Sequence, residues 1–293
     1  MPESAVALSG VTKHFGPKAV LRGVELQLQA GTTVGFVGPN GAGKTTCMRL
    51  MVGLAFRDGG TARVLGHDPG RDGVAVRQRC SYLPGECGLY DALTGEETLR
   101  FALQFYERRH RDLEDRLRAD FALPLDARVR EYSSGMKQKL ALMAALLPDV
   151  DLYLLDEPDR NLDPPSRLQL RDALHELQAR DRTILVSSHH LGEVDALSHR
   201  LVFLLHGQVV DDARIEAARD RLSSMIRVRL RTEVPLPDGA ARLGVEPDGS
   251  LRLAVIGEPL RWVARLDPAA IRSLEVGATR LDDLYRVLTE NSP

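Results

Sequence analysis

A glycine-rich segment near the N-terminus places the strongest constraint on what this chain can fold into. Residues 38–46 read GPNGAGKTT, and they follow a β-branched and apolar run at residues 32–37. A strand that leads into such a loop and then into a helix brings together backbone N–H groups, a cation and a hydroxyl, which a triphosphate needs. The segment fits the pattern GxxxxGK(S/T), so the chain is predicted to bind a nucleoside triphosphate; the alternative is an ordinary glycine-rich turn.

The residue types in this segment have distinct physical roles. Lys44 can reach the β and γ phosphates, and Thr45 can ligate Mg²⁺ through its hydroxyl. Glycines let the backbone approach the phosphates closely. The other predicted nucleotide-binding residues of the segment are Gly38, Asn40, Gly41, Gly43 and Thr46.

Length and composition indicate a globular protein. With 293 residues and 43% hydrophobic content, the chain has room for one large and one small domain. Lys and Arg number 39 against 41 Asp and Glu, so neither a polyanion-binding tail nor a strongly acidic surface is indicated. The three cysteines are too few for a disulfide framework, and we expect buried thiols in a reducing cytoplasm. We expect no secretory signal, and the longest apolar run, 140–147, is far shorter than the roughly 20 residues that cross a bilayer.

The pattern along the chain indicates an α/β fold. Short apolar runs at 152–155 and 183–186 are typical of strands buried in a parallel sheet, and they flank a helix that begins after Asp163. Helical patterns dominate from about 84 to 149, which predicts a helical subdomain inserted into the core. We therefore expect a nucleotide-binding α/β domain at 1–220 and a small α+β accessory domain at 221–293.

The accessory region contains a strictly alternating run at 226–231. Alternation of this kind predicts a half-exposed strand. One face of it carries three arginines, at positions 227, 229 and 231. A solvated strand face is the favoured interpretation, and contact with anionic lipid or a protein partner is the alternative.

Two adjacent acids, Asp156 and Glu157, end the apolar run that begins at Leu152. Open α/β sheets bind ligands at the carboxyl ends of their strands. We expect Asp156 to hold Mg²⁺ together with Thr45, and Glu157 to orient or deprotonate the water that attacks the γ-phosphate. The alternative for Glu157 is a surface charge at the end of a strand.

Residues 132–140 read YSSGMKQKL and lie between the phosphate loop and the acid pair. In this order the three motifs resemble the ATP-binding cassette (ABC) superfamily, whose signature is most often LSGGQ; Ser133 and Gly135 match it. The resemblance implies a P-loop ATPase core with a parallel-rich sheet. It also implies that Ser133 and Gly135 bind the γ-phosphate of ATP on a second ABC subunit, so hydrolysis requires two cassettes. A helix N-terminus offers the free N–H groups for this contact.

Further matches extend the resemblance over most of residues 5–210. Phe15 stands where the family has the aromatic that stacks on adenine; a core phenylalanine is the alternative. His189 follows an apolar strand, as the family's switch histidine does, and is expected to contact the γ-phosphate. His67 lies in a recurring family turn and is given no catalytic role.

Two positions depart from the family pattern. Gly85, followed by Glu86, replaces a glutamine that ligates Mg²⁺ and links to the membrane partner, and we expect Glu86 to substitute for it in part. Arg160 stands where the family usually has serine, and signalling between subunits is the property for which the resemblance to the family then gives no firm expectation.

The 82–86 and 132–136 segments and the C-terminal region resemble ABC-2 type exporter ATPases, a group that includes drug-resistance efflux subunits. The resemblance implies an ATP- and Mg²⁺-dependent ATPase that powers a separate transmembrane permease from the inner face of the cell membrane. The partner would contact the helical insertion, especially Leu89 to Leu99.

Two other functions are considered. A soluble ABC ATPase acting on nucleic acid or ribosomes would generally carry a second cassette, a long coiled coil or zinc-binding cysteines, none of which the sequence contains, and no nucleic-acid partner is expected. A non-hydrolytic ATP-sensing module is disfavoured by Glu157 and His189.

Overall fold

The computed structural model describes residues 4–86, 88–188, 191–231, 235–276 and 281–290. The chain forms two compact units, Met1–Val209 and Val210–Pro293. The sequence places the division later, at 220/221. The difference arises from helix α8 (Asp212–Ser223), which packs against α10 (Leu281–Glu290) of the second unit.

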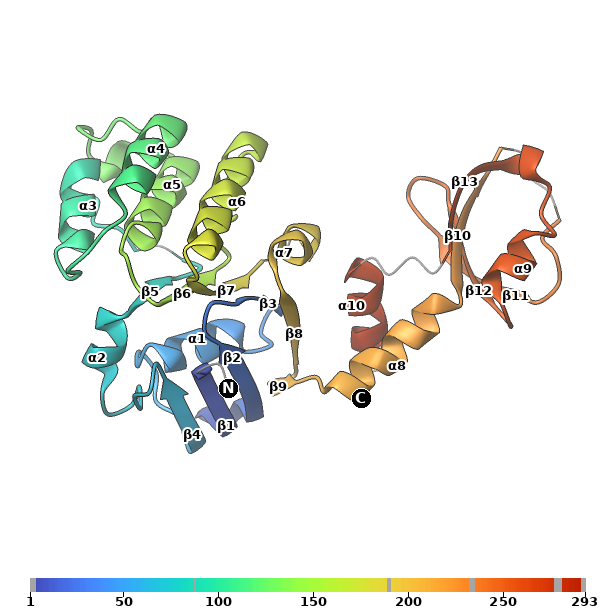
Figure 1. The fold of residues 1–293 in the computed structure, drawn as a ribbon, viewed down its shortest axis with the longest axis horizontal. Helices are drawn as coiled ribbons and strands as arrows, with labels where there is room; N and C mark the ends of the chain where they lie inside the picture. The colour runs from blue at the N-terminus through green and yellow to red at the C-terminus, as the bar shows by residue number, and fades with distance from the viewer. Residues whose placement is uncertain (1–3, 87, 189–190, 232–234, 277–280, 291–293) are drawn as a thin grey trace. The chain divides into compact units, whose positions relative to one another are not determined.

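A six-stranded, mainly parallel sheet forms the centre of the first unit (Figure 1). Its order is β5-β6-β7-β3-β8-β9, and only β9 pairs antiparallel. The central strands are apolar and buried, as parallel strands covered on both faces should be. The strands are β3 (Thr33–Val37), β5 (Cys80–Leu83), β6 (Leu152–Asp156), β7 (Thr183–Ser187), β8 (Arg200–Leu205) and β9 (Gln208–Val209).

A three-stranded antiparallel sheet covers one side of this core. It has the order β2-β1-β4, formed by β1 (Ser4–Phe15), β2 (Lys18–Gln29) and β4 (Gly59–Val64). Helix α1 (Lys44–Met51) contacts β2, β4 and β6, so it lies between the two sheets (Figure 1). Buried aliphatic side chains from both sheets and from α1 form one continuous core here.

Strands β1 and β2 are longer than the sequence suggests. Residues 6–24 read as short strand-like runs with turns, yet they form one long hairpin with several register shifts. Gly10 (φ +60°) and Gly23 (φ +81°) adopt positive φ angles within the strands. Glycine tolerates the left-handed conformation, so these residues accommodate bulges without ending the strands.

Helices cover the other face of the six-stranded sheet (Figure 1). A second buried core joins them to β5, β6 and β7. Residues 94–97 read TGEE, a spacing that predicts a capping box, and the box forms at the start of α3: Thr94 accepts from Glu97 N, and the Glu97 carboxylate accepts from Thr94 N. The remaining elements of this unit are α2 (Gly73–Gln78), α3 (Gly95–Leu103), α4 (Arg111–Phe121), a 3₁₀ turn (Val129–Glu131), α5 (Ser134–Leu146), α6 (Pro164–Ala179) and α7 (Leu191–Leu197).

The second unit contains a four-stranded antiparallel sheet with the order β11-β12-β10-β13. Trp262 is buried against this sheet and donates through Nε1 to the carbonyl of Pro237 at 3.1 Å. The unit is therefore α+β, with its own small core. Its further elements are β10 (Met225–Leu230), β11 (Ala240–Val245), β12 (Leu251–Val255), α9 (Pro259–Val263), a 3₁₀ turn (Pro268–Ala270) and β13 (Ile271–Val276).

The arginine-bearing face of β10 is solvated only in part: Arg231 is exposed and Arg229 is half-buried, whereas Arg227 is enclosed by acids. The Arg227 side chain is only 13% exposed, and its guanidinium lies 2.8 Å from Glu275 and 3.0 Å from Asp283. Acids from β13 and α10 thus neutralise this arginine.

Among the described residues, no helix combines the length and apolar character needed to cross a bilayer.

Candidate nucleotide-binding site

The loop between β3 and α1 has a backbone that only glycine can adopt at key points. Gly43 caps α1 with φ +108°, and a Cβ there would lie 2.7 Å from Leu21 Cδ2. A Cβ on Gly38 would lie 2.2 Å from the carbonyl oxygen of Leu204. Gly41, with φ +79°, has open space around it, and the neighbouring Asn40 is exposed. The loop therefore packs tightly at its ends, while its tip is open to solvent.

Lys44 begins helix α1 and is only 6% exposed. Its ammonium donates hydrogen bonds to the carbonyls of Gly38 at 2.6 Å and Pro39 at 3.2 Å. Burial lowers the pKa of Lys44, and the nearby carboxylates of Glu157 and Asp156 oppose this shift. The side chain thus curls back over the loop, where it places a positive charge.

Thr45 and Asp156 come together at the carboxyl ends of the parallel strands. Thr45 Oγ1 donates to Asp156 Oδ2 at 2.5 Å, and Asp156 is 1% exposed. Thr46, the next residue of α1, is half-buried. The structure therefore joins the phosphate loop to the first predicted acid.

Ser187, the last residue of β7, organises both acids and was missed as a site residue by the sequence reasoning. Its hydroxyl donates to Asp156 Oδ1 at 2.8 Å. Its hydroxyl and its carbonyl each accept from the backbone N–H of Glu157 at 3.1 Å. The available signal was a serine directly after the apolar run at 183–186, next to the acid-bearing strand.

Glu157 follows β6 in a left-handed conformation with φ +52°. The left-handed backbone conformation costs free energy for any residue other than glycine. It persists only where contacts with the surrounding structure hold the residue in it. The N–H of Glu157 donates to both the hydroxyl and the carbonyl of Ser187, and these two contacts hold the residue in this conformation. The negative charge of this carboxylate raises the pKa of Lys44, opposing the effect of burial.

Two further predicted residues have different outcomes. Phe15 ends β1 and is 56% exposed, and the ammonium of Lys13 lies 5.4 Å from its ring centroid. This exposure rules out the alternative of a core phenylalanine and leaves an aromatic surface at the hairpin turn. His189 lies outside the described residues.

Ser133 and Gly135 lie at the start of α5. Ser133 is the N-cap, and its hydroxyl accepts from Met136 N at 3.2 Å. A Cβ on Gly135 would lie 3.1 Å from the carbonyl oxygen of Asn161, so only a very small residue fits against the loop after Glu157. These two residues are exposed or half-buried at a helix N-terminus, where N–H groups are available to an anion.

The two departures from the family pattern touch each other. Arg160 Nη1 donates to the carbonyl of Gly85 at 3.1 Å, and the same nitrogen lies 3.9 Å from Glu86 Oε1. The Glu86 side chain is 89% exposed. Its expected substitution for the missing glutamine stays a prediction.

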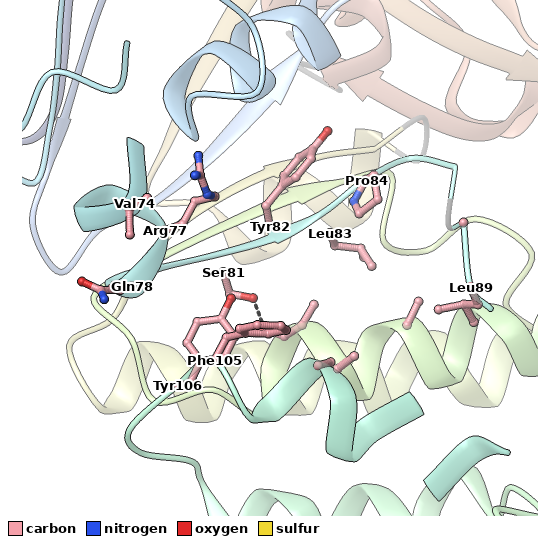
Figure 2. Close-up of a pocket in the computed structure, with 15 residues that line it drawn as sticks. Val74, Arg77, Gln78, Ser81, Tyr82, Leu83, Pro84, Leu89, Phe105 and Tyr106 are labelled. Atoms are coloured by element: carbon pink, nitrogen blue, oxygen red, sulfur yellow. Dashed lines mark hydrogen bonds between the residues drawn. The ribbon is translucent and has the colours of Figure 1, made fainter. Parts of the chain in front are cut away.

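A groove of about 550 Å³ lies between the core and the helical subdomain (Figure 2). Figure 2 shows Val74 at one end, Leu89 at the other and Phe105 with Tyr106 between them. Its walls come from α2, β5 and the helical subdomain, and small side chains of α5 (Ala141, Ala144 and Ala145) complete it. Beside it, the exposed rings of Tyr90, Phe101 and Phe105 stack edge to face. This is a mainly apolar surface.

Comparisons with known proteins agree with the geometry. Residues 21–160 match the family model described as ABC transporter. The chain is 33% identical to the daunorubicin/doxorubicin resistance ATP-binding protein DrrA of Streptomyces peucetius, over 98% of this chain and 93% of that protein. It is 34% identical to the Nod factor export ATP-binding protein I of Burkholderia lata, over 98% and 94%.

A solved structure of an ATP-binding subunit of an ABC transporter superposes with a TM-score of 0.66. It is 29% identical and covers 73% of this chain and 92% of its own. This chain is thus similar to such subunits over most of its length. It also contains the phosphate loop, the buried Asp156 beside Thr45 and the start of α5 at Ser133. The protein belongs to the ATP-binding subunits of ABC transporters, which bind and hydrolyse ATP.

Proposed function

We propose that this ATPase powers a separate membrane permease of the ABC-2 exporter type and works as a nucleotide-sandwiched dimer on the cytoplasmic face of the membrane. The hydrogen-bonded set of Thr45, Asp156, Ser187 and Glu157 supports the ATPase part of the proposal, because it holds the Asp156 carboxylate and the backbone of Glu157 beside the phosphate loop. The exporter assignment is supported by relatives that are named for drug resistance and Nod factor export.

Mg²⁺ fits the donor set at Thr45 and Asp156. Both side chains offer oxygen atoms, and these atoms lie 2.5 Å apart. Mg²⁺ prefers oxygen and is usually bound by one or two carboxylates together with substrate phosphates rather than by an all-protein cage. When bound, the ion would neutralise charge on the phosphates.

Glu157 acts as the base that orients or deprotonates the attacking water. The left-handed backbone of Glu157 and its hydrogen bonds to Ser187 fix the backbone position from which the carboxylate side chain extends. Lys44 supplies a positive charge to the β and γ phosphates from a site that largely excludes water. His189 contacts the γ-phosphate, and the exposed ring of Phe15 stacks on the adenine.

A second cassette completes the site. The start of α5 offers unpaired backbone N–H groups, the positive end of a helix dipole and the Ser133 hydroxyl. These groups bind the γ-phosphate held by a partner subunit, and the partner does the same in return. ATP closes the dimer because the closed state binds each γ-phosphate from two sides, and hydrolysis reopens it.

The groove beside Leu89 receives the permease. It is lined mainly by apolar residues, and Phe105, 63% exposed, lies at its edge. Large exposed apolar surfaces commonly mark interaction sites, and aromatic residues are enriched in protein interfaces. The described residues contain no helix that could itself cross a bilayer.

Dimer formation tests the nucleotide-sandwich proposal. The Glu157→Gln variant should dimerise in ATP and Mg²⁺, measured by light scattering, and adding Ser133→Asp should abolish the dimer, because Asp can still cap the helix but places a negative charge at this exposed tip. Ala92→Asp, at another exposed position of the helical subdomain, is the matched control and should leave the dimer intact. A Glu157→Gln chain that stays monomeric at high concentration would contradict this part of the proposal.

Detergent co-purification from the native cell tests the permease. An integral membrane protein should copurify with the wild-type chain and stimulate its ATPase activity. Phe105→Ser should weaken the association, whereas Leu168→Ser should not, because Leu168 is a similarly exposed apolar residue on α6, away from the groove. Equal recovery of the membrane protein with both variants would remove the groove from the interface.

A further inference from the structure

Arg160 connects two segments that lie 75 residues apart in the sequence. Its guanidinium donates to the carbonyl of Gly85 at 3.1 Å and lies 3.9 Å from the Glu86 carboxylate. An arginine fork can bond a carbonyl and approach a carboxylate at the same time, which a serine at this position could not do.

The segment that carries Arg160 is held firmly to the nucleotide site. The N–H of Arg160 donates to the carbonyl of Glu157 at 3.2 Å, within the turn whose left-handed residues are Glu157 and Asn161. Gln138 of α5 donates to the carbonyl of Pro158 at 2.9 Å, and Ser188 donates to Asp159 at 2.6 Å. The backbone of Arg160 therefore moves only together with the loop at 157–163.

The segment that carries Gly85 lies between the nucleotide site and the groove. A Cβ on Gly85 would lie 3.5 Å from Asp156 Oδ2, so its backbone runs beside the predicted metal ligand. Its neighbours Pro84, Gly88 and Leu89 line the groove. Because Gly85 has no side chain, Arg160 can contact it only through the backbone, and the bond is to the Gly85 carbonyl.

We propose that Arg160 is a positioning residue that ties the catalytic loop at 157–163 to the groove-lining residues around Gly85. Through this hydrogen bond, nucleotide binding at the phosphate loop restrains the groove, and an occupied groove restrains the position of Glu157. The inference deepens the proposed function, because it assumes that the groove receives the partner.

The bond to Gly85 carries this link rather than the ion pair with Glu86. The Glu86 side chain is 89% exposed and that of Arg160 is 46% exposed. At 3.9 Å the contact with Glu86 is too long for a hydrogen bond, whereas the 3.1 Å contact with the Gly85 carbonyl is one, and exposed ion pairs without a hydrogen bond contribute little because water and salt screen them. Glu86→Gln should therefore preserve the link, and Arg160→Ser should break it.

Hydrogen exchange measured by mass spectrometry tests the link without a permease. The full chain is used in a Glu157→Gln background, with and without ATP and Mg²⁺, and exchange is followed in peptides that cover residues 38–46 and 85–89. In this parent both peptides should exchange more slowly with ATP. Adding Arg160→Ser should keep the slowing at 38–46 and abolish it at 85–89, and Arg160→Lys should restore part of it because an ammonium can also donate to the carbonyl.

Matched variants separate the link from a general loss of structure. Arg171→Ser removes an exposed arginine of α6 and should behave as the parent, as should Glu86→Gln. The inference is overturned if 85–89 still slows with ATP in Arg160→Ser, or if the parent shows no ATP-dependent change there. A parent that shows no slowing at 38–46 would instead contradict the proposed nucleotide site, and with it the link.

Discussion

Ser187 donates a hydrogen bond from its hydroxyl to Asp156 Oδ1 at 2.8 Å, and the same hydroxyl accepts from the N–H of Glu157 at 3.1 Å. One side chain on β7 thus orients both acids at the end of β6. Ser187→Ala should lower kcat by about 10- to 100-fold, the range typical for residues that orient metal ligands. It should also raise the Mg²⁺ concentration needed for half-maximal activity, since Asp156 loses a partner.

Steady-state ATPase assays over a range of Mg²⁺ concentrations check this prediction. Ser81→Ala is the matched control, because Ser81 is also a buried serine at a strand and bonds the carbonyl of Ala145 instead. If both variants lose the same activity, general destabilisation rather than the orientation of Asp156 is the cause.

Glu157→Gln should keep ATP affinity and reduce turnover by roughly 10²- to 10⁴-fold, the usual contribution of a general base. The amide cannot take a proton, but it preserves the shape of the side chain. Equilibrium binding of a fluorescent ATP analogue and single-turnover hydrolysis measure the two properties separately. Glu131→Gln, at an exposed acid of the helical subdomain, should change neither. Near-normal turnover in Glu157→Gln would exclude this carboxylate as the base.

Gly43→Ala and Gly41→Ala should differ in the free energy of unfolding, measured by urea denaturation without nucleotide. Both glycines have positive φ, which costs another residue about 1–3 kcal/mol. Only at Gly43 does the added Cβ also meet neighbouring atoms, at 2.7 Å from Leu21 and 3.1 Å from Val20. Gly43→Ala should therefore be the more destabilising change and should abolish ATP binding, and equal destabilisation would show that the packing is more tolerant than these distances imply.

His110 should make stability depend on pH. The residue is 4% exposed, and burial lowers its pKa from the ordinary 6.5, opposed chiefly by Asp149. Arg180 Nη1 lies 2.6 Å from His110 Nδ1, and Tyr153 Oη lies 3.1 Å from Nε2. Because the guanidinium is always a donor, Nδ1 must accept, which requires the neutral ring.

The sign of the effect follows from the lowered pKa. The unfolded chain takes up the proton more readily, so the stability from His110 is complete above pH 6.5 and is lost as the pH falls through that value toward the folded pKa. Urea unfolding midpoints between about pH 7.5 and about pH 5.5 should fall more steeply for the wild type than for His110→Gln. The other charged groups around the ring, Asp112 and Arg182, are the same in both proteins, so parallel curves would remove His110 from the pH dependence.

Several features follow from the sequence because they depend on residues close together in the chain. The phosphate loop, the apolar strand before Asp156 and the capping box at Thr94 each involve contacts over only a few residues. Their spacing alone predicts the local backbone, and the structure places a strand, a loop and a helix at residues 33–51 as expected. The α/β class follows in the same way from short apolar runs that alternate with helices.

Other features were decided only by the tertiary structure, because they join distant segments. Ser187 meets Asp156 across 31 residues because β6 and β7 pair in parallel with these two residues in register. Arg160 reaches Gly85, and Arg227 is neutralised by acids from two later elements, only once the chain has packed. Spacing along a sequence determines which backbone a short segment adopts, whereas strand order and packing determine which side chains meet.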